Sequence, residues 1–128
     1  MMDRRFFLAL LGATALAGPD ARAFEIRAYD KGPAQAAIAA GGPVVVHVYA
    51  SWCLQCHIQE SILDKLKTDP AYRGIALYRV DYDGQKDAVK ALNCPRSTLI
   101  AYRGGKEVAR MSWGVSDDAV TGVLKAAL

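Results

Sequence analysis

The spacing of apolar residues is typical of strands in some segments of the chain and of helices in others, so the sequence predicts both. Five segments have the apolar, often β-branched composition of strands: 24–29, 43–49, 74–82, 98–102 and 107–111. Residues 43–49 are almost entirely apolar, so we expect a central strand that is buried on both faces. The last two strands are separated by Arg103-Gly104-Gly105-Lys106, which is a hairpin signal.

Between these strands, and after the last one, the apolar residues have the spacing of helices. Four helices are predicted, over 31–40, 56–67, 85–92 and the residues that follow Ser116. Gly41-Gly42 stops the first helix, and Asp69-Pro70 ends the second. Ser116 can cap the last helix, with acidic residues in its first turn and Lys125 in its last.

The order of these elements predicts an α/β fold. Strands that alternate with helices favour parallel pairs joined by right-handed crossovers. The closing hairpin adds antiparallel strands at one edge. We therefore expect a mixed central sheet with helices on both of its faces.

The first 23 residues have the composition of an export signal. Arg4 and Arg5 precede an apolar run, 6–17, that is too short for an ordinary membrane span. Residues 21–23 match a small-x-small cleavage pattern, which predicts cleavage after Ala23 and one soluble periplasmic domain over 24–128. The alternatives are an uncleaved anchor and, because of the arginine pair, twin-arginine export.

Charge and cysteine count narrow the possible functions. A formal net charge of +3 over 128 residues gives no electrostatic reason to expect nucleic-acid binding. Three cysteines would leave one over in a purely structural disulfide framework. In an exported protein this odd number suggests redox use.

Cys53 and Cys56 form a Cys-x-x-Cys motif between the central strand and the second helix. A helix N-terminus offers unpaired N–H groups and a favourable dipole to a thiolate. This setting can lower a cysteine pKa from about 8.5 to roughly 3.5–7.5, and an easily formed thiolate is what disulfide exchange requires. The alternative is a structural disulfide or two buried thiols.

In this context the chain resembles the thioredoxin family over 24–128. Residues 44–56 look like the family's central strand and active-site turn, 78–83 like its third strand, and 97–106 like the segment that begins with its cis-proline. Gly114 matches a glycine near the family's active site. The resemblance implies a thioredoxin fold, exchange with protein thiols and disulfides without a cofactor or metal, recycling by a membrane redox partner, and a monomer.

The resemblance also implies roles for individual residues. Cys53 would attack from an exposed helix start, and Cys56 would resolve the mixed disulfide. The residues expected to bind substrate are Trp52, Arg96, Ser97, Thr98 and Gly114. Trp113 could line the same groove, although we expect it to pack in the core.

The chain departs from the family where the cis-proline is expected, because Ser97 stands there. A cis bond before a residue other than proline costs about 2.5–4 kcal/mol, so we expect the Arg96–Ser97 bond to be trans. In the family the backbone just before that proline pairs with the substrate. Here Arg96 would take that place, and Ser97 would contribute an extra N–H.

Two further departures bear on the redox chemistry. His47 replaces the family's buried acid, six residues before Cys53. It is either a catalytic proton acceptor or a packed histidine. Leu54-Gln55 is neither of the dipeptides typical of thioredoxin and of strong periplasmic oxidants, so the redox direction stays open, with a preference for reduction.

Cys94 is the thiol outside the motif, and the resemblance places its loop near the motif. It is either a free, half-buried thiol or a third redox thiol that exchanges with Cys53.

Two other classes of protein fit parts of the sequence. Cys53-Leu54-Gln55-Cys56-His57 has the spelling of a c-type haem attachment site, with Met111 or His47 as a second axial ligand. A Cu or Zn carrier could use the thiols together with His57. The sandwiched position of the motif in a mixed sheet argues against haem.

Overall fold

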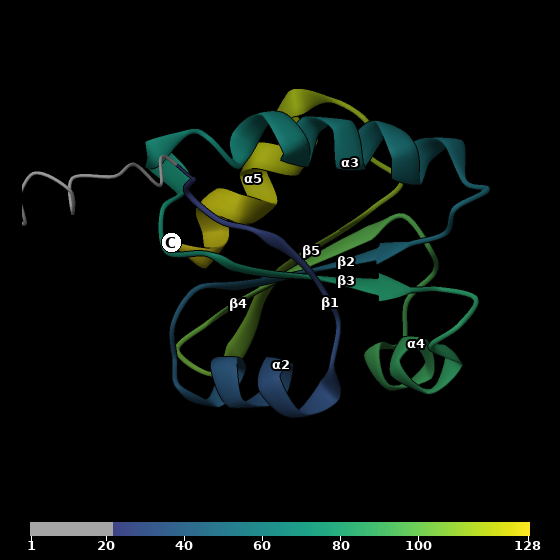
Figure 1. Ribbon diagram of the computed structural model, residues 1–128, viewed down its shortest axis with the longest axis horizontal. Helices are drawn as coiled ribbons and strands as arrows, with labels where there is room; N and C mark the ends of the chain where they lie inside the picture. The colour runs from purple at the N-terminus through teal and green to yellow at the C-terminus, as the bar shows by residue number, and fades with distance from the viewer. Residues whose placement is uncertain (1–21) are drawn as a thin grey trace, which may run out of the picture.

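A computed structural model describes residues 22–128 as a mixed sheet between two layers of helices (Figure 1). The elements are β1 (Ile26–Ala28), α2 (Lys31–Ala39), β2 (Val44–Tyr49), α3 (Leu54–Leu66), η1 (Pro70–Tyr72), β3 (Ala76–Asp81), α4 (Lys86–Leu92), β4 (Thr98–Arg103), β5 (Lys106–Ser112) and α5 (Asp117–Ala127). Most of the predicted export signal, residues 1–21, lies outside the described residues.

The sheet has the strand order β1-β3-β2-β4-β5. β3 runs parallel to both β1 and β2, whereas β4 is antiparallel to β2 and to β5. The central position of β2 explains its composition, because its first five residues are all buried. The predicted α/β fold with a closing antiparallel hairpin is confirmed.

Each predicted strand and helix of the domain is present, with ends that differ by a few residues. The second helix, for which helical spacing predicts a start at Cys56, begins at Leu54, because Cys53 caps it. The short 3-10 helix η1 was not predicted. It is capped by the Asp69 carboxylate, which accepts a hydrogen bond from the Ala71 N–H at 2.9 Å. The predicted Ser116 cap is confirmed, since its hydroxyl accepts from the Ala119 N–H at 3.1 Å.

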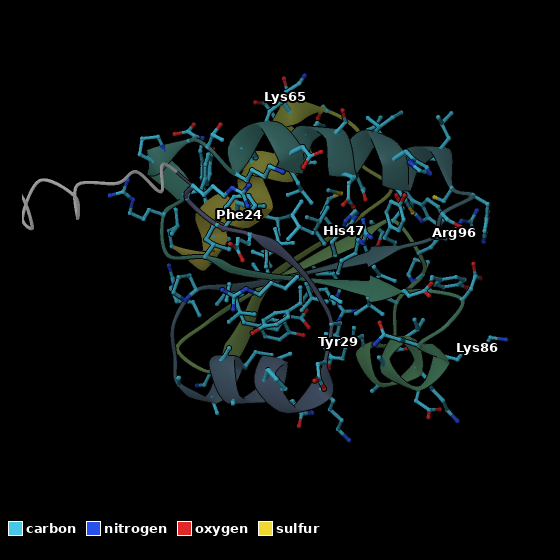
Figure 2. The ribbon with its side chains drawn as sticks, in the orientation of Figure 1. Phe24, Tyr29, His47, Lys65, Lys86 and Arg96 are labelled. Atoms are coloured by element: carbon cyan, nitrogen blue, oxygen red, sulfur yellow. The ribbon has the colours of Figure 1, made fainter. Side chains whose placement is uncertain are left out.

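Helices cover both faces of the sheet: α3 and α5 lie on one, and α2 and α4 on the other (Figure 1). Side chains alternate along β2, so Val46 and Val48 pack on the α2 and α4 side. Val45 belongs to the main core with residues of α3 and α5. His47 therefore points toward α3, where Figure 2 shows it between the sheet and that helix.

The start of the domain is tied to its core. Ala23 and Phe24 are both buried in the main hydrophobic cluster. The Ala23 N–H donates to the Lys67 carbonyl at 2.6 Å, and the Gly74 N–H donates to the Ala23 carbonyl at 3.2 Å. Cleavage after Ala23 stays a prediction, and it would remove these two hydrogen bonds while leaving Phe24 in the core. In residues 22–128 no helix is long and apolar enough to span a bilayer.

Packing at Gly114 gives a test of the fold. A Cβ added there would lie 2.6 Å from the Met111 sulfur and 2.8 Å from the Ala119 Cβ. We expect Gly114→Ala to lower the free energy of unfolding by about 1–3 kcal/mol through overpacking. Gly122→Ala is the matched control, because Gly122 lies inside α5 with open space around it. That change should raise the free energy by about 0.5–1 kcal/mol. Urea unfolding of both variants measures the difference, and equal stabilities would contradict this packing.

Candidate functional site

The two motif cysteines meet in the first turn of α3. Cys53 has an extended backbone and occupies the N-cap position of the helix. Its sulfur accepts a hydrogen bond from the Cys56 N–H at 3.3 Å, and the Cys56 thiol approaches the Val48 carbonyl at 3.9 Å. The end of β2 and the beginning of α3 thus bring both sulfurs to one helical turn.

Both sulfurs are less accessible than the sequence suggested. Cys53 is only 2% exposed and Cys56 is fully buried, so the expectation of an exposed Cys53 is wrong. The two cysteines form a small cluster with Ala50, against which Tyr49 and Tyr82 pack. The sulfur predicted to attack is therefore recessed.

The environments of the two thiols differ in their electrostatics. Burial raises the pKa of the Cys53 thiol, but hydrogen bonds from Cys56 and the charge of Arg96 outweigh this effect, so the pKa is lowered. Burial and the hydrogen bond with Cys53 raise the pKa of Cys56. Cys53 is therefore the thiol of the pair that loses its proton at the lower pH. This asymmetry fits the roles of attacking and resolving thiol.

Arg96 lies between two tryptophans beside this turn. Its guanidinium carbon is 4.5 Å from the ring centroid of Trp52 and 4.9 Å from that of Trp113. The Trp52 indole N–H donates to the Asp83 carboxylate at 2.7 Å. Trp113 is 41% exposed, so the expectation that it packs in the core is wrong. The aromatic contacts fix the position of the arginine next to Cys53.

The loop that contains Ser97 is held by its own backbone. No cis peptide bond occurs in residues 22–128, so Arg96–Ser97 is trans as predicted. Ser97 has a left-handed backbone with φ of 62°. Its N–H, the extra donor noted in the sequence, donates to the Val48 carbonyl at 2.8 Å, and its carbonyl accepts from the Trp113 N–H at 2.8 Å. Thr98 is buried and its hydroxyl donates to the Pro95 carbonyl at 2.9 Å.

Gln59 connects the loops on both sides of the motif. Its amide nitrogen donates to the Ser97 carbonyl at 3.1 Å and to the Gly114 carbonyl at 2.9 Å. Its amide oxygen lies 2.9 Å from the Nε2 of His47, so in this arrangement Nε2 carries the proton. The predicted site residues Ser97 and Gly114 are thus joined to His47 through one buried side chain.

The other ring nitrogen of His47 faces an ion pair between Glu60 and Arg79. Its Nδ1 lies 3.4 Å from a carboxylate oxygen of Glu60, and the other oxygen of Glu60 accepts from Arg79 at 2.6 Å. Burial raises the pKa of Glu60, but His47 and Arg79 outweigh it, so the pKa is lowered. His47 therefore lies next to an ionised carboxylate.

Gln59 and Glu60 were not identified from the sequence as partners of His47. Gln59 follows Cys56 by three residues and precedes Ile62 by three, so helical spacing already placed it on the buried face of α3. A polar residue on such a face was the available signal. Nothing in the sequence identified its partners, which lie up to 55 residues away.

Cys94 packs apart from the motif. It lies against the cluster of Val46, Val48 and Val80, on the α2 and α4 side of the sheet. Burial raises the pKa of its thiol, with Arg110 acting in the opposite direction. Exchange between Cys94 and Cys53 stays a prediction.

His57 and Met111, which suggested a haem or metal site in the sequence, contact other residues of the chain. The His57 ring lies beside the Tyr49 hydroxyl, 3.2 Å from Nδ1, and its Nε2 contacts the Ser51 carbonyl. The Met111 sulfur accepts from the Gly114 N–H at 3.1 Å. No group of three or more potential metal ligands of the His, Cys, Asp and Glu types gathers anywhere in residues 22–128.

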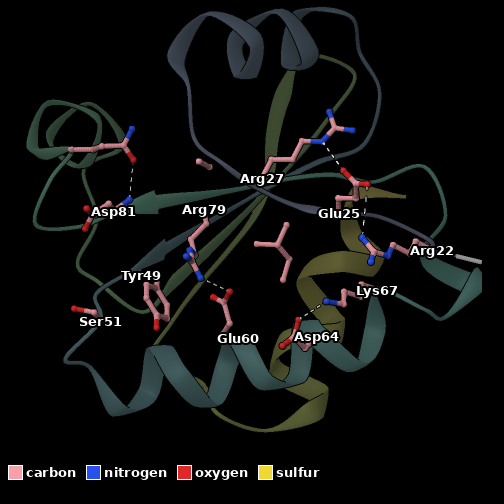
Figure 3. A pocket seen from close by; sticks show the side chains of 13 residues that line it. Arg22, Glu25, Arg27, Tyr49, Ser51, Glu60, Asp64, Lys67, Arg79 and Asp81 are labelled. Atoms are coloured by element: carbon pink, nitrogen blue, oxygen red, sulfur yellow. Dashed lines mark hydrogen bonds and ion pairs between the residues drawn. The ribbon is translucent and has the colours of Figure 1, made fainter. Parts of the chain in front are cut away.

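A charged cleft of about 610 Å³ lies beside the site (Figure 3). Its lining is Arg22, Glu25, Ile26, Arg27, Ala28, Tyr49, Ser51, Glu60, Asp64, Lys67, Arg79, Asp81 and Gln85. Opposite charges pair in its lining: Arg79 of β3 contacts Glu60 of α3 at 2.6 Å, and Lys67 contacts Asp64 along the same helix at 3.0 Å. The cysteines are not part of its lining, but Glu60 next to His47 and Tyr49, which packs against the cysteine cluster, both are.

Comparison with known proteins gives consistent matches. The sequence model of the thioredoxin family matches residues 28–126. Thioredoxin-2 of Saccharomyces cerevisiae is 39% identical over 69 residues, which is 53% of this chain and 64% of that protein. The thiol:disulfide interchange protein DsbE of Pseudomonas fluorescens is 36% identical over 53 residues, which is 41% of this chain and 28% of that protein. The matches thus span less than two thirds of either of these relatives.

Solved structures give matches of fuller length. The structure of Trxlp from Edwardsiella tarda has a TM-score of 0.74 and 38% identity, and the alignment covers 78% of this chain and 98% of that one. Oxidised thioredoxin from Plasmodium falciparum, at 18% identity and a TM-score of 0.65, shows the same fold over 79% of this chain and 96% of its own.

The unequal cysteine environments predict an ordered alkylation. In reduced protein, the lowered pKa of Cys53 leaves it a thiolate at pH values where Cys56 and Cys94 are still protonated. Its alkylation rate should fall only when the pH drops through this lowered pKa, below the value of about 8.5 for a free thiol. Iodoacetamide labelling across pH, with peptide mapping, measures each midpoint. A Cys53 midpoint at or above that of Cys94 would contradict the described electrostatics.

Proposed function

Because the chain belongs to the thioredoxin family, we propose that it is a thiol–disulfide oxidoreductase that acts on protein substrates through Cys53 and Cys56. The observation that carries this proposal is the Cys56 N–H···Cys53 sulfur hydrogen bond at the start of α3. It supports a thiolate on Cys53 and keeps Cys56 within one turn of it. No cofactor is needed for the exchange.

The exchange runs in two steps. The Cys53 thiolate attacks a substrate disulfide, so the substrate S–S bond breaks, a mixed disulfide forms, and one substrate sulfur leaves as a thiolate. Cys56 then loses its proton and attacks the Cys53 sulfur, which releases the second substrate thiolate. The protein is left with a Cys53–Cys56 disulfide, and two electrons have passed to the substrate.

His47 is our candidate for the proton acceptor of Cys56. Its support is its position on β2 six residues before Cys53, its complete burial, and the ionised Glu60 beside it. Nε2 is hydrogen-bonded to Gln59, whereas Nδ1 lies 3.4 Å from Glu60 without a hydrogen bond, so Nδ1 is the ring nitrogen that would accept the proton.

We propose reduction as the main direction. The Trp52-Cys53 context and the matches to proteins named thioredoxin support it. Arg96 acts the other way, because it stabilises the thiolate of the reduced state. The pair should therefore be a weaker reductant than it would be without this arginine.

The periplasm is the proposed compartment, with recycling by a membrane redox partner. The export pattern of residues 1–23 and the match to DsbE support it. In this proposal the domain over residues 24–128 acts as a monomer on client protein disulfides.

Cysteine substitutions test the proposed function. Cys53→Ser should abolish the reduction of insulin disulfides, because the attacking thiolate is gone, and turbidity follows the reaction. Cys56→Ser should instead accumulate a mixed disulfide that mass mapping assigns to Cys53. Cys94→Ser should keep activity, since burial holds that thiol protonated.

Two outcomes would count against this account. Retained activity in Cys53→Ser would overturn the assignment of the nucleophile and of the function. For the third thiol, a Cys53–Cys94 bridge in oxidised Cys56→Ser protein would establish exchange, and its consistent absence would reject it.

A further inference from the structure

The guanidinium of Arg96 is a positive charge held at the edge of the reacting sulfur. It lies 4.5 Å from the Trp52 ring and 4.9 Å from the Trp113 ring, and Figure 2 places it at the end of the sheet where α3 begins. Both rings are well exposed, at 58% and 41%. We propose that Arg96 binds a carboxylate next to the substrate cysteine, so that the protein selects disulfides in acidic segments of its protein substrates. The inference rests on the proposed function and names its substrate class.

Arg96 has no carboxylate partner of its own. None of the ion pairs among residues 22–128 includes it, and its Nε is buried without a hydrogen-bond partner. The acid beside the aromatic pair, Asp83, is engaged by the Trp52 N–H instead. A guanidinium offers five N–H donors in a planar fork that fits a carboxylate. Because Nε is buried, the terminal N–H groups of the half-buried guanidinium are the donors left for an anion from outside the chain.

The backbone around Arg96 is shaped to hold this arrangement. Ser97 and Trp113 both have left-handed φ values, 62° and 71°, which side chains other than glycine rarely adopt. The Trp113 N–H donates to the Ser97 carbonyl, which ties the two residues together and sets the second indole against Arg96. Strained backbone of this kind is concentrated at functional sites.

The position of Arg96 relative to Cys53 specifies where the carboxylate must be. The guanidinium is close enough to the Cys53 sulfur to interact with it by hydrogen bonding and by charge. A substrate carboxylate on the remaining donors would thus lie within a residue or so of the disulfide under attack. A single planar contact of this kind adds a charge-assisted hydrogen bond without changing the exchange chemistry.

The test compares disulfide-linked peptide dimers that differ only beside the cysteine, with Glu, Gln or Lys there. Each dimer is reduced by the protein, and excess dithiothreitol regenerates the dithiol. We expect kcat/KM for the Glu peptide to exceed that for the Gln peptide about tenfold at low salt, and the Lys peptide to be slowest. The preference should shrink as salt is added.

Two variants isolate the arginine. Arg96→Gln should bring the Glu/Gln ratio close to one. Arg103→Gln removes the same charge from an exposed position at the end of β4, and it should keep the ratio, which separates local binding from the attraction of the +3 chain for any acid. Because the ratio is measured within one protein sample, partial unfolding of a variant does not imitate the effect. Arg96→Lys should retain only part of the preference, since the planar fork is lost.

The outcomes separate this inference from the proposed function. Equal turnover of the Glu and Gln peptides by the unchanged protein, or an acidic preference that survives Arg96→Gln, would overturn the role of Arg96 while leaving the oxidoreductase in place. Failure to reduce any of the peptides or insulin would overturn the proposed function itself.

Discussion

The hydrogen bond from the Cys56 N–H to the Cys53 sulfur depends on where α3 begins, and the rest of the site is arranged around that turn. β2 is buried along almost its whole length and delivers the chain to the carboxyl edge of the sheet. Cys53 then caps the helix with its own side chain in place of a serine or aspartate. A hydrogen bond from a backbone N–H favours the charged form of the capping sulfur. The contact that starts the helix therefore also stabilises the Cys53 thiolate.

A second constraint keeps the surroundings of this turn in place. The side-chain amide nitrogen of Gln59 donates hydrogen bonds to the carbonyls of Ser97 and Gly114, and its amide oxygen faces His47. Arg96 directly precedes Ser97 in one of these loops, and Trp113 directly precedes Gly114 in the other. Fixing the two loops to α3 thus also fixes the arginine between its tryptophans. The buried network and the placement of the arginine that we propose to select substrates therefore depend on the same side chain.

The sequence predicted the fold well because its signals are local. The β-branched run of β2, the glycine pair after α2 and the Ser116 cap each depend on neighbours within a few residues. The position of the motif followed from these elements. The motif was correctly predicted to open the second helix, but the apolar spacing placed the first helical residue at Cys56 instead of Leu54, because a cysteine is an unexpected cap.

The details of the site were less predictable because they depend on distant contacts. Helical spacing placed Gln59 on the buried face of α3, but its partners come from two loops that sequence distance does not connect. Trp113 stays 41% exposed and lies against Arg96, which is 4.9 Å from its ring and comes from another loop. The burial of Cys53 likewise follows from tertiary packing with Tyr49 and Tyr82. Residue types indicated the chemistry, and only the folded chain indicated which residues share it.

The redox equilibrium of the reduced protein with a glutathione buffer, read by mass mapping of every cysteine, tests the central claim most directly. The account predicts one reversible two-electron transition in which Cys53 and Cys56 form a disulfide while Cys94 keeps its thiol. Cys53 and Cys56 that stay reduced throughout, or a transition that pairs other cysteines, would contradict it.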